Sequence, residues 1–136
     1  MKWISFIIIF GFYSLTAQAA PVDEYLRQLA SEAKQDDPSF SSFDAMRGEK
    51  IFTSTHVGKR GKRVSCTSCH GKNLQVDGEN IFTGKRIAPL SPKANPKRLS
   101  KIKNMKKWLR RNFKDVYNRD GTAREKGDVL LYIMNK

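Results

Sequence analysis

CTSCHGKN, residues 66–73, contains both cysteines of the chain and one of its two histidines. Three kinds of site use such a Cys-x-x-Cys-His or Cys-x-x-Cys pattern: a redox-active dithiol, part of a zinc site, and the covalent attachment of a haem. Each kind of site requires different partners elsewhere in the chain. The remaining sequence therefore decides what Cys66, Cys69 and His70 do.

The setting of the motif favours the haem. A structural zinc site needs four Cys or His ligands, and outside the motif the chain offers only His56. A thioredoxin-like dithiol is expected in a βαβ unit, which this sequence does not indicate. In c-type haem attachment both thiols form thioether bonds and the histidine becomes the proximal iron ligand. We therefore predict one haem c, bound covalently through Cys66 and Cys69, with His70 on the iron. An exported thiol-disulfide oxidoreductase without haem is a minor alternative.

The first residues, MKWISFIIIFGFYSLTAQAAP, have the pattern of a secretory signal peptide. Lys2 precedes an apolar run, and AQA at residues 17–19 has the small-residue spacing of a cleavage site. The apolar run is short for a bilayer span, which disfavours a retained membrane anchor. We predict a signal peptide over residues 1–19, a single domain over residues 20–136, and a periplasmic location.

The chain carries a formal net charge of +13, from 26 Lys and Arg against 13 Asp and Glu. Basic residues gather in KRGKR, residues 59–63, and from Lys97 to Lys114. Such a surface favours an acidic protein, an anionic membrane or nucleic acid as partner. Export argues against nucleic acid, so we expect an acidic redox partner that is attracted by charge.

Helical periodicity dominates the chain after the leader. Helices are predicted from Pro21 towards Pro38, over residues 42–53, from Ser100 to Val116, and after Thr122, with a short helical turn over residues 66–70. Gly48 and Phe52 lie four residues apart on one helix face, so the glycine permits close approach of another helix and the ring fills the space beside it.

The helix ends and the loops complete the predicted architecture. Ser100 is the expected N-cap of the third long helix, and Thr122 and Glu125 form a capping box at the start of the last one. Residues 71–95 have no sustained periodicity and are predicted to form a long loop. A loop of this length is unusual in a small domain unless it wraps around a bound group. No strand is predicted. The expected fold is all-α, with about four helices wrapped around one covalently bound haem and a long loop.

The sixth iron ligand stays open on residue types alone. The candidates are Met46, Met105, Met134, His56, a lysine, an uncommon side chain, or no ligand at all. Methionine at helical spacing is more often core packing than a ligand, and His56 falls in a basic loop.

Four segments together resemble one family. They are CTSCHG from residue 66, TGKRIAPLSPKANPKRLS from residue 83, KWLRRN from residue 107 and REKGDVLLYI from residue 124. They resemble the Sphaeroides haem protein family, a group of small class-I-like c-type cytochromes. The resemblance implies a haem that is high-spin when oxidised, with an asparagine as the sixth ligand on the helix after the long loop. The matching residue is Asn112, four residues after Trp108.

The resemblance also implies a function. In the family the asparagine leaves the iron on reduction, which opens the distal face to oxygen or nitric oxide. Family members receive electrons from a dihaem cytochrome c and a membrane b-type cytochrome. Helical spacing is compatible with this, because Asn112 lies one turn beyond Trp108, and a neutral amide oxygen is a hard ligand that suits ferric better than ferrous iron. The alternative is a low-spin electron carrier with Met105 as a permanent ligand.

One feature departs from the family pattern. The family's asparagine is followed by a cysteine that pairs with another just before the last helix, whereas this chain has Phe113 and Gly121 at those positions. We expect Phe113 to replace the bridge by packing in the core. For the haem propionates, the expected partners are basic side chains: Lys85, Arg86, Arg98 and Arg111.

Overall fold

The computed structural model describes residues 20–136. The predicted signal peptide, residues 1–19, lies outside the described residues. The helices are α1 (Pro21–Asp36), α2 (Ala45–Thr53), α3 (Thr67–His70), α4 (Ile102–Tyr117) and α5 (Ala123–Met134), with one 3-10 turn, η1 (Lys59–Gly61). The helix-dominated architecture agrees with the prediction, and α3 is the short turn expected at the cysteine motif.

The centre of the fold is a close crossing of α2 and α5. A Cβ on Gly48 would stand 2.0 Å from the backbone oxygen of Asp128 and 2.9 Å from the Cβ of Tyr132. Phe52, one turn further along α2, is 2% exposed, and its ring lies 5.4 Å from that of Tyr132. The predicted close approach at Gly48 is therefore confirmed.

A buried carboxylate fixes the same crossing. Asp128 of α5 is 1% exposed. Its Oδ1 accepts hydrogen bonds from the Asp44 backbone N–H (2.7 Å) and the Arg47 Nη2 (2.9 Å), and its Oδ2 accepts one from the Arg47 Nε (2.8 Å). Asp44 in turn caps α2, because its side chain accepts from the backbone N–H of Met46 and of Arg47. These bonds compensate the desolvation of a buried charge.

Helix α4 presents its apolar face to this core. The buried residues on this face are Met105, Leu109, Phe113 and Val116. The predicted start is wrong by one residue. Ser100 donates its hydroxyl to the Lys97 carbonyl (2.7 Å), and Lys101 is the N-cap without a side-chain hydrogen bond.

The prediction that the chain has no strands is also wrong. Two short antiparallel ladders pair β1 (His56–Val57) with β2 (Arg63–Val64), and β3 (Gly78–Glu79) with β4 (Arg86–Ile87). Positive φ angles at Gly61 (69°) and Gly84 (65°) allow the tight turns between the paired strands. Strands of two residues are too short to show an alternating pattern in sequence.

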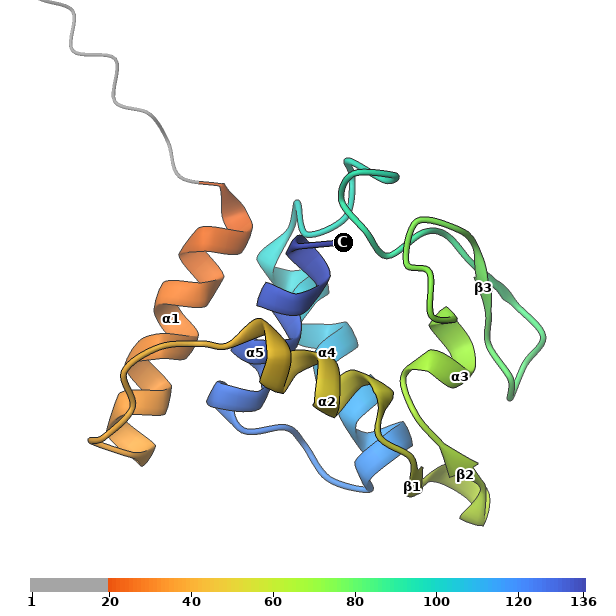
Figure 1. Ribbon diagram of the computed structural model, residues 1–136, viewed down its shortest axis with the longest axis horizontal. Coiled ribbons are helices and arrows are strands. Elements are labelled where there is room, and N and C mark those ends of the chain that lie inside the picture. Colours follow the sequence, from red (N-terminus) through yellow and green to blue (C-terminus); the bar gives the residue numbers. More distant parts are fainter. Residues whose placement is uncertain (1–19) are drawn as a thin grey trace, which may run out of the picture.

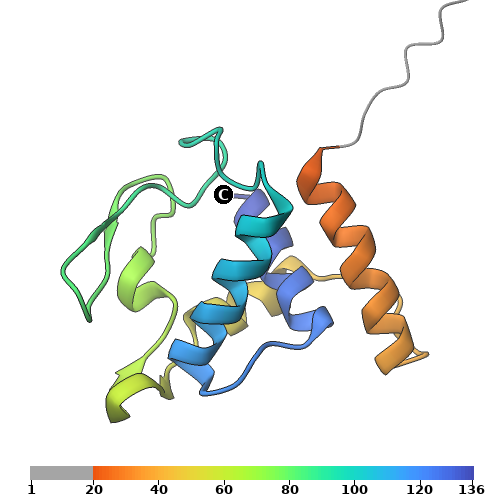
Figure 2. The ribbon, with the colours of Figure 1, turned by 180° about the vertical axis from the view of Figure 1, so that it is seen from behind.

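Figures 1 and 2 show how these elements are arranged. Helix α1 lies at one end of the molecule, α3 and the β3–β4 ladder lie at the other, and α4 and α5 lie between them. The buried face of α1 includes Tyr25 and Leu29, and Lys106 of α4 lies over the Tyr25 ring (5.4 Å). Among the helices of residues 20–136, we find no segment with the length and apolarity that crossing a membrane requires.

Candidate functional site

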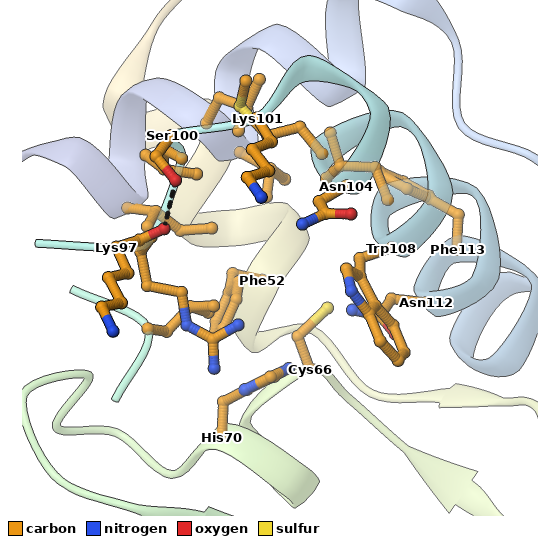
Figure 3. A pocket seen from close by; sticks show the side chains of 18 residues that line it. Phe52, Cys66, His70, Lys97, Ser100, Lys101, Asn104, Trp108, Asn112 and Phe113 are labelled. Atoms are coloured by element: carbon orange, nitrogen blue, oxygen red, sulfur yellow. Dashed lines mark hydrogen bonds between the residues drawn. The ribbon is translucent and has the colours of Figure 1, made fainter. Parts of the chain in front are cut away.

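Two adjoining cavities open between α3, α4 and the β3–β4 hairpin. Their volumes are about 140 and 500 Å³, and the larger is in the usual size range of ligand sites. Figure 3 shows the smaller one, with Cys66 and His70 facing Trp108 and Asn112. The residues that line both cavities are Cys66, His70, Leu90, Arg98, Trp108 and Asn112. The cavities therefore form one continuous site.

Helix α3 brings the motif to one wall of this site. Cys66 is the N-cap of α3, and Cys69 and His70 belong to its single turn. The first residue of β3 packs closely on this turn, since a Cβ on Gly78 would stand 2.1 Å from the Cys69 carbonyl oxygen. Burial, with a smaller contribution from Cys69, raises the pKa of the Cys66 thiol to about 12. Before the haem is attached, the folded chain therefore favours the neutral thiol at Cys66.

The protonation state of His70 suits metal binding. Burial, and secondarily the charge of Arg98, lower the pKa of His70 to about 4. The imidazole is therefore uncharged at neutral pH, which is the form that ligates a metal. The ring of Phe52 lies 5.9 Å from the His70 ring and supports it from α2.

Helix α4 forms the opposite wall. Asn112 is half-buried, and Trp108 lies one turn before it. Two cations lie near the Trp108 ring: Lys107 Nζ and the Arg111 guanidinium, each 5.2 Å from the ring centre. The amide groups of other asparagines hydrogen-bond to the chain, among them Asn73, Asn80, Asn95 and Asn118. Within residues 20–136, the Asn112 amide makes no such bond. It is left available to the cavity.

The other potential ligands are less well placed. Met105 is buried and lines only the smaller cavity. Met46 is 72% exposed, and Met134 packs against the hydrophobic core. His56 stacks on Tyr117 with ring centres 4.2 Å apart, and its Nε2 lies 3.1 Å from the Ser54 hydroxyl. Neither cavity is lined by His56, Met46 or Met134.

The cations predicted to pair with the haem propionates line the larger cavity: Lys85, Arg86, Arg98 and Arg111. Arg98 has a structural task as well, since its Nε donates to the Pro89 carbonyl (2.8 Å) and its Nη2 to the Ala88 carbonyl (2.6 Å). Arg86 pairs with Asp77. The pairing of these cations with propionates stays a prediction.

Phe82, in the β3–β4 hairpin, is a residue of the site that the sequence prediction missed. Phe82, at the turn of this hairpin, lines the larger cavity and lies within 6 Å of two cations, Lys59 (5.4 Å) and Arg60 (5.8 Å). The sequence did contain a signal for this turn, which is Asn80 four residues before Gly84. The Asn80 side chain accepts hydrogen bonds from the backbone N–H of Phe82 and of Thr83, which is a turn that asparagine favours.

Two comparisons address the family. A protein-family model described as a domain of unknown function, DUF1924, matches residues 38–133. The cytochrome c-type protein SHP of Cereibacter sphaeroides is 43% identical over 90 residues, which are 66% of this chain and 69% of that protein. The chain belongs to the Sphaeroides haem protein family. The resemblance carried by the four sequence segments is confirmed.

Further relatives support the fold. Cytochrome c'' of Methylophilus methylotrophus is 26% identical over 131 residues, 96% of this chain and 90% of that protein. Its oxidised crystal structure matches with a TM-score of 0.76 at 26% identity, over 85% of this chain and 94% of that one. Oxidised SHP, an oxygen-binding cytochrome c, matches with a TM-score of 0.75 at 34% identity, over 88% and 100%. The predicted all-α, cytochrome c-like fold is confirmed.

Membership of the family establishes the cofactor. The chain binds one haem c, covalently through Cys66 and Cys69. The side chains of the site fit that group: two cysteines on one turn, an uncharged His70 beside them, a cavity of about 500 Å³ and apolar walls from α2, α4 and α5.

Proposed function

We propose that this protein is an exported, high-spin haem c protein that binds a diatomic ligand such as oxygen or nitric oxide at the distal face. His70 is the proximal ligand and Asn112 the distal one. The observation that carries the proposal is the position of Asn112. It lines both cavities opposite His70, and its amide has no other partner within the described residues.

The chemistry of the donor explains why the ligand would leave. The haem supplies an iron that changes between the ferric and ferrous states. A neutral amide oxygen is a hard, weak donor, so Asn112 holds ferric iron better than ferrous iron. Reduction would therefore weaken the binding of Asn112 and leave its side of the cavity accessible to a diatomic ligand. SHP, a relative of this chain, is an oxygen-binding cytochrome c.

A simple electron carrier is the second candidate. Met105 is the methionine of α4 that lines the smaller cavity, and it lies seven residues, or about two helical turns, before Asn112. A methionine sulfur binds iron in both oxidation states in low-spin cytochromes. This candidate therefore predicts a closed distal face in the reduced protein.

The first test is the absorption spectrum of Asn112→Ala. We expect the ferric spectrum to change and the reduced spectrum to stay nearly the same, because Asn112 is bound only in the ferric state. Asn104→Ala is the matched control, since Asn104 lies two turns earlier on α4, is exposed and lines only the smaller cavity. A ferric spectrum of Asn112→Ala identical to wild type would exclude Asn112 as the ligand.

Carbon monoxide separates the two candidates without a mutation. We expect a clear shift of the main absorption band when it is added to the reduced wild-type protein. An unshifted, low-spin spectrum would favour the electron carrier, and Met105→Ala would then convert the protein from low-spin to high-spin.

The electron supply and the location complete the proposal. The protein works in the periplasm and receives electrons from an acidic partner, a dihaem cytochrome c fed by a membrane b-type cytochrome. The supporting observations are the apolar run near the N-terminus, the net charge of +13 and the cations around the larger cavity.

A further inference from the structure

Phe113 follows Asn112 directly on α4 and lines the smaller cavity. It is 5% exposed. Its ring lies against Gly121, so closely that a Cβ on Gly121 would stand 2.8 Å from three ring carbons, Cγ, Cδ2 and Cε2. Gly121 is itself buried. The aromatic ring therefore occupies the space that any side chain at position 121 would need.

Gly121 provides a firm support for this ring. It immediately precedes Thr122, whose hydroxyl caps α5 while the Glu125 carboxylate accepts from the Thr122 backbone N–H (2.8 Å). Arg119 holds the same carboxylate through two hydrogen bonds, of 2.7 and 2.6 Å. The loop from Arg119 to Thr122 is thus tied to the first turn of α5.

The ring is also held from the side of α4. Phe113 packs on Tyr117, one turn later, with ring centres 5.4 Å apart. The Tyr117 hydroxyl donates to the Ile51 carbonyl (2.6 Å), and the Asn118 amide donates to the Val57 carbonyl (2.8 Å). The end of α4 that follows Asn112 is therefore attached to α2, β1 and the start of α5.

We propose that Phe113 is a positioning residue. By packing its ring against Gly121, it holds Asn112 in place over the haem site. The inference rests on the proposed role of Asn112. Neighbouring residues of a helix share one rigid backbone, so a ring that fixes the rotation of α4 at position 113 also fixes the direction of the side chain at position 112. Gly121 is the residue that makes this seat possible, because it has no Cβ.

The test measures how fast imidazole binds to the ferric, haem-loaded protein, since imidazole must displace Asn112. We expect Phe113→Ala to accelerate binding by about threefold or more, which is the size of typical coupling between residues in contact. Gly121→Ala should act in the same direction from the other side of the contact. The rate of carbon monoxide binding to the reduced protein should not change, because Asn112 has already left.

A matched control separates positioning from general destabilisation. Leu29→Ala also removes a fully buried side chain, but Leu29 lies on α1 and lines neither cavity. We expect it to lower the melting temperature about as much as Phe113→Ala does and to leave the imidazole rate unchanged. Equal acceleration by both variants would overturn the proposal.

A double-mutant cycle tests whether Phe113 acts through Asn112. In the Asn112→Ala background, Phe113→Ala should have no further effect on the imidazole rate. A full additive effect would overturn the positioning role and leave the ligand role intact. If Asn112→Ala alone left the rate unchanged, the proposed function would fail first.

A crosslink provides the rescue. The Phe113 Cγ lies 2.8 Å from the Cβ position of Gly121, so the two Cβ positions are at most about 4.3 Å apart, which a disulfide can span. Once its disulfide has formed, F113C/G121C should bind imidazole at the wild-type rate. F113S/G121S, which cannot form a disulfide, should bind imidazole faster than wild type. Equal rates in both double variants would contradict the proposal.

Discussion

Gly48 is a single position on which the α2–α5 crossing depends. We expect Gly48→Ala to destabilise the protein by about 1–3 kcal/mol or more, because the added methyl group would overlap the backbone of α5. The better helix propensity of alanine, about 1 kcal/mol, offsets part of this cost. Denaturant unfolding of the haem-loaded protein measures the difference.

Lys50→Ala is the control for Gly48→Ala. Lys50 lies on the same short helix and is exposed, so its replacement should change the free energy of unfolding by less than about 0.5 kcal/mol. Similar losses in the two variants would mean that the crossing at Gly48 is not limiting.

Residue patterns predicted one half of the site better than the other. Cys66, Cys69 and His70 were assigned from their spacing, because covalent haem attachment needs those residue types in that order. Asn112 was assigned only through the family resemblance, since an asparagine near the end of a helix has the same appearance in sequence whether it binds iron or water. Phe113 and Gly121 are eight residues apart and meet across a turn. Their contact was expected only because they occupy the positions of the family's paired cysteines.

At the scale of elements, the two long C-terminal helices begin differently. Thr122 caps α5 within a complete capping box, whereas the Ser100 hydroxyl near the start of α4 donates to the Lys97 carbonyl. We expect Thr122→Ala to lower the free energy of unfolding by about 1 kcal/mol. Ser100→Ala should change it by less than about 0.5 kcal/mol. Thermal unfolding of both variants side by side checks this, and a larger loss in Ser100→Ala would contradict the assignment of the caps.

The prediction of Ser100 as a cap failed for a local reason. Leu99 has a positive φ of 58°, which turns the chain before the helix, and α4 starts only at Ile102. A serine followed by a helical repeat contains no information about such a turn. The long helices were predicted because their apolar faces repeat over several turns. The hairpins were not predicted, because strands of two residues show no repeat in the sequence.

At the scale of the whole molecule, charge is distributed unevenly. Residues 80–114 contain twelve Lys and Arg and no Asp or Glu, whereas residues 21–44 contain six acidic and two basic side chains. The hairpins and α1 lie at opposite ends (Figure 1). Positive charge therefore extends from α4 to the β3–β4 hairpin and includes the cations that line the larger cavity, whereas the segment that contains α1 is mainly acidic. An acidic partner that approaches would be oriented towards the haem.

This polarity predicts the salt dependence of electron transfer. Oxidation of the reduced protein by ferricyanide, an anion, should slow as ionic strength rises. K62E/R63E, at the hairpin end, should slow the reaction severalfold at low salt. R27E/K34E makes the same change in net charge on exposed residues of α1 and should have little effect. Equal slowing in both variants would indicate that only the net charge matters.

The seat of Phe113 on Gly121 has a consequence for biogenesis. Both cysteines of the chain are consumed by the haem, so the mature protein has no thiol left to oxidise or exchange. While the cofactor is being attached, no third cysteine competes for the pair at Cys66 and Cys69. A contact made of a ring and a glycine also cannot be opened by a reductant. The tie between α4 and α5 is thus independent of the redox poise of the compartment in which the protein matures.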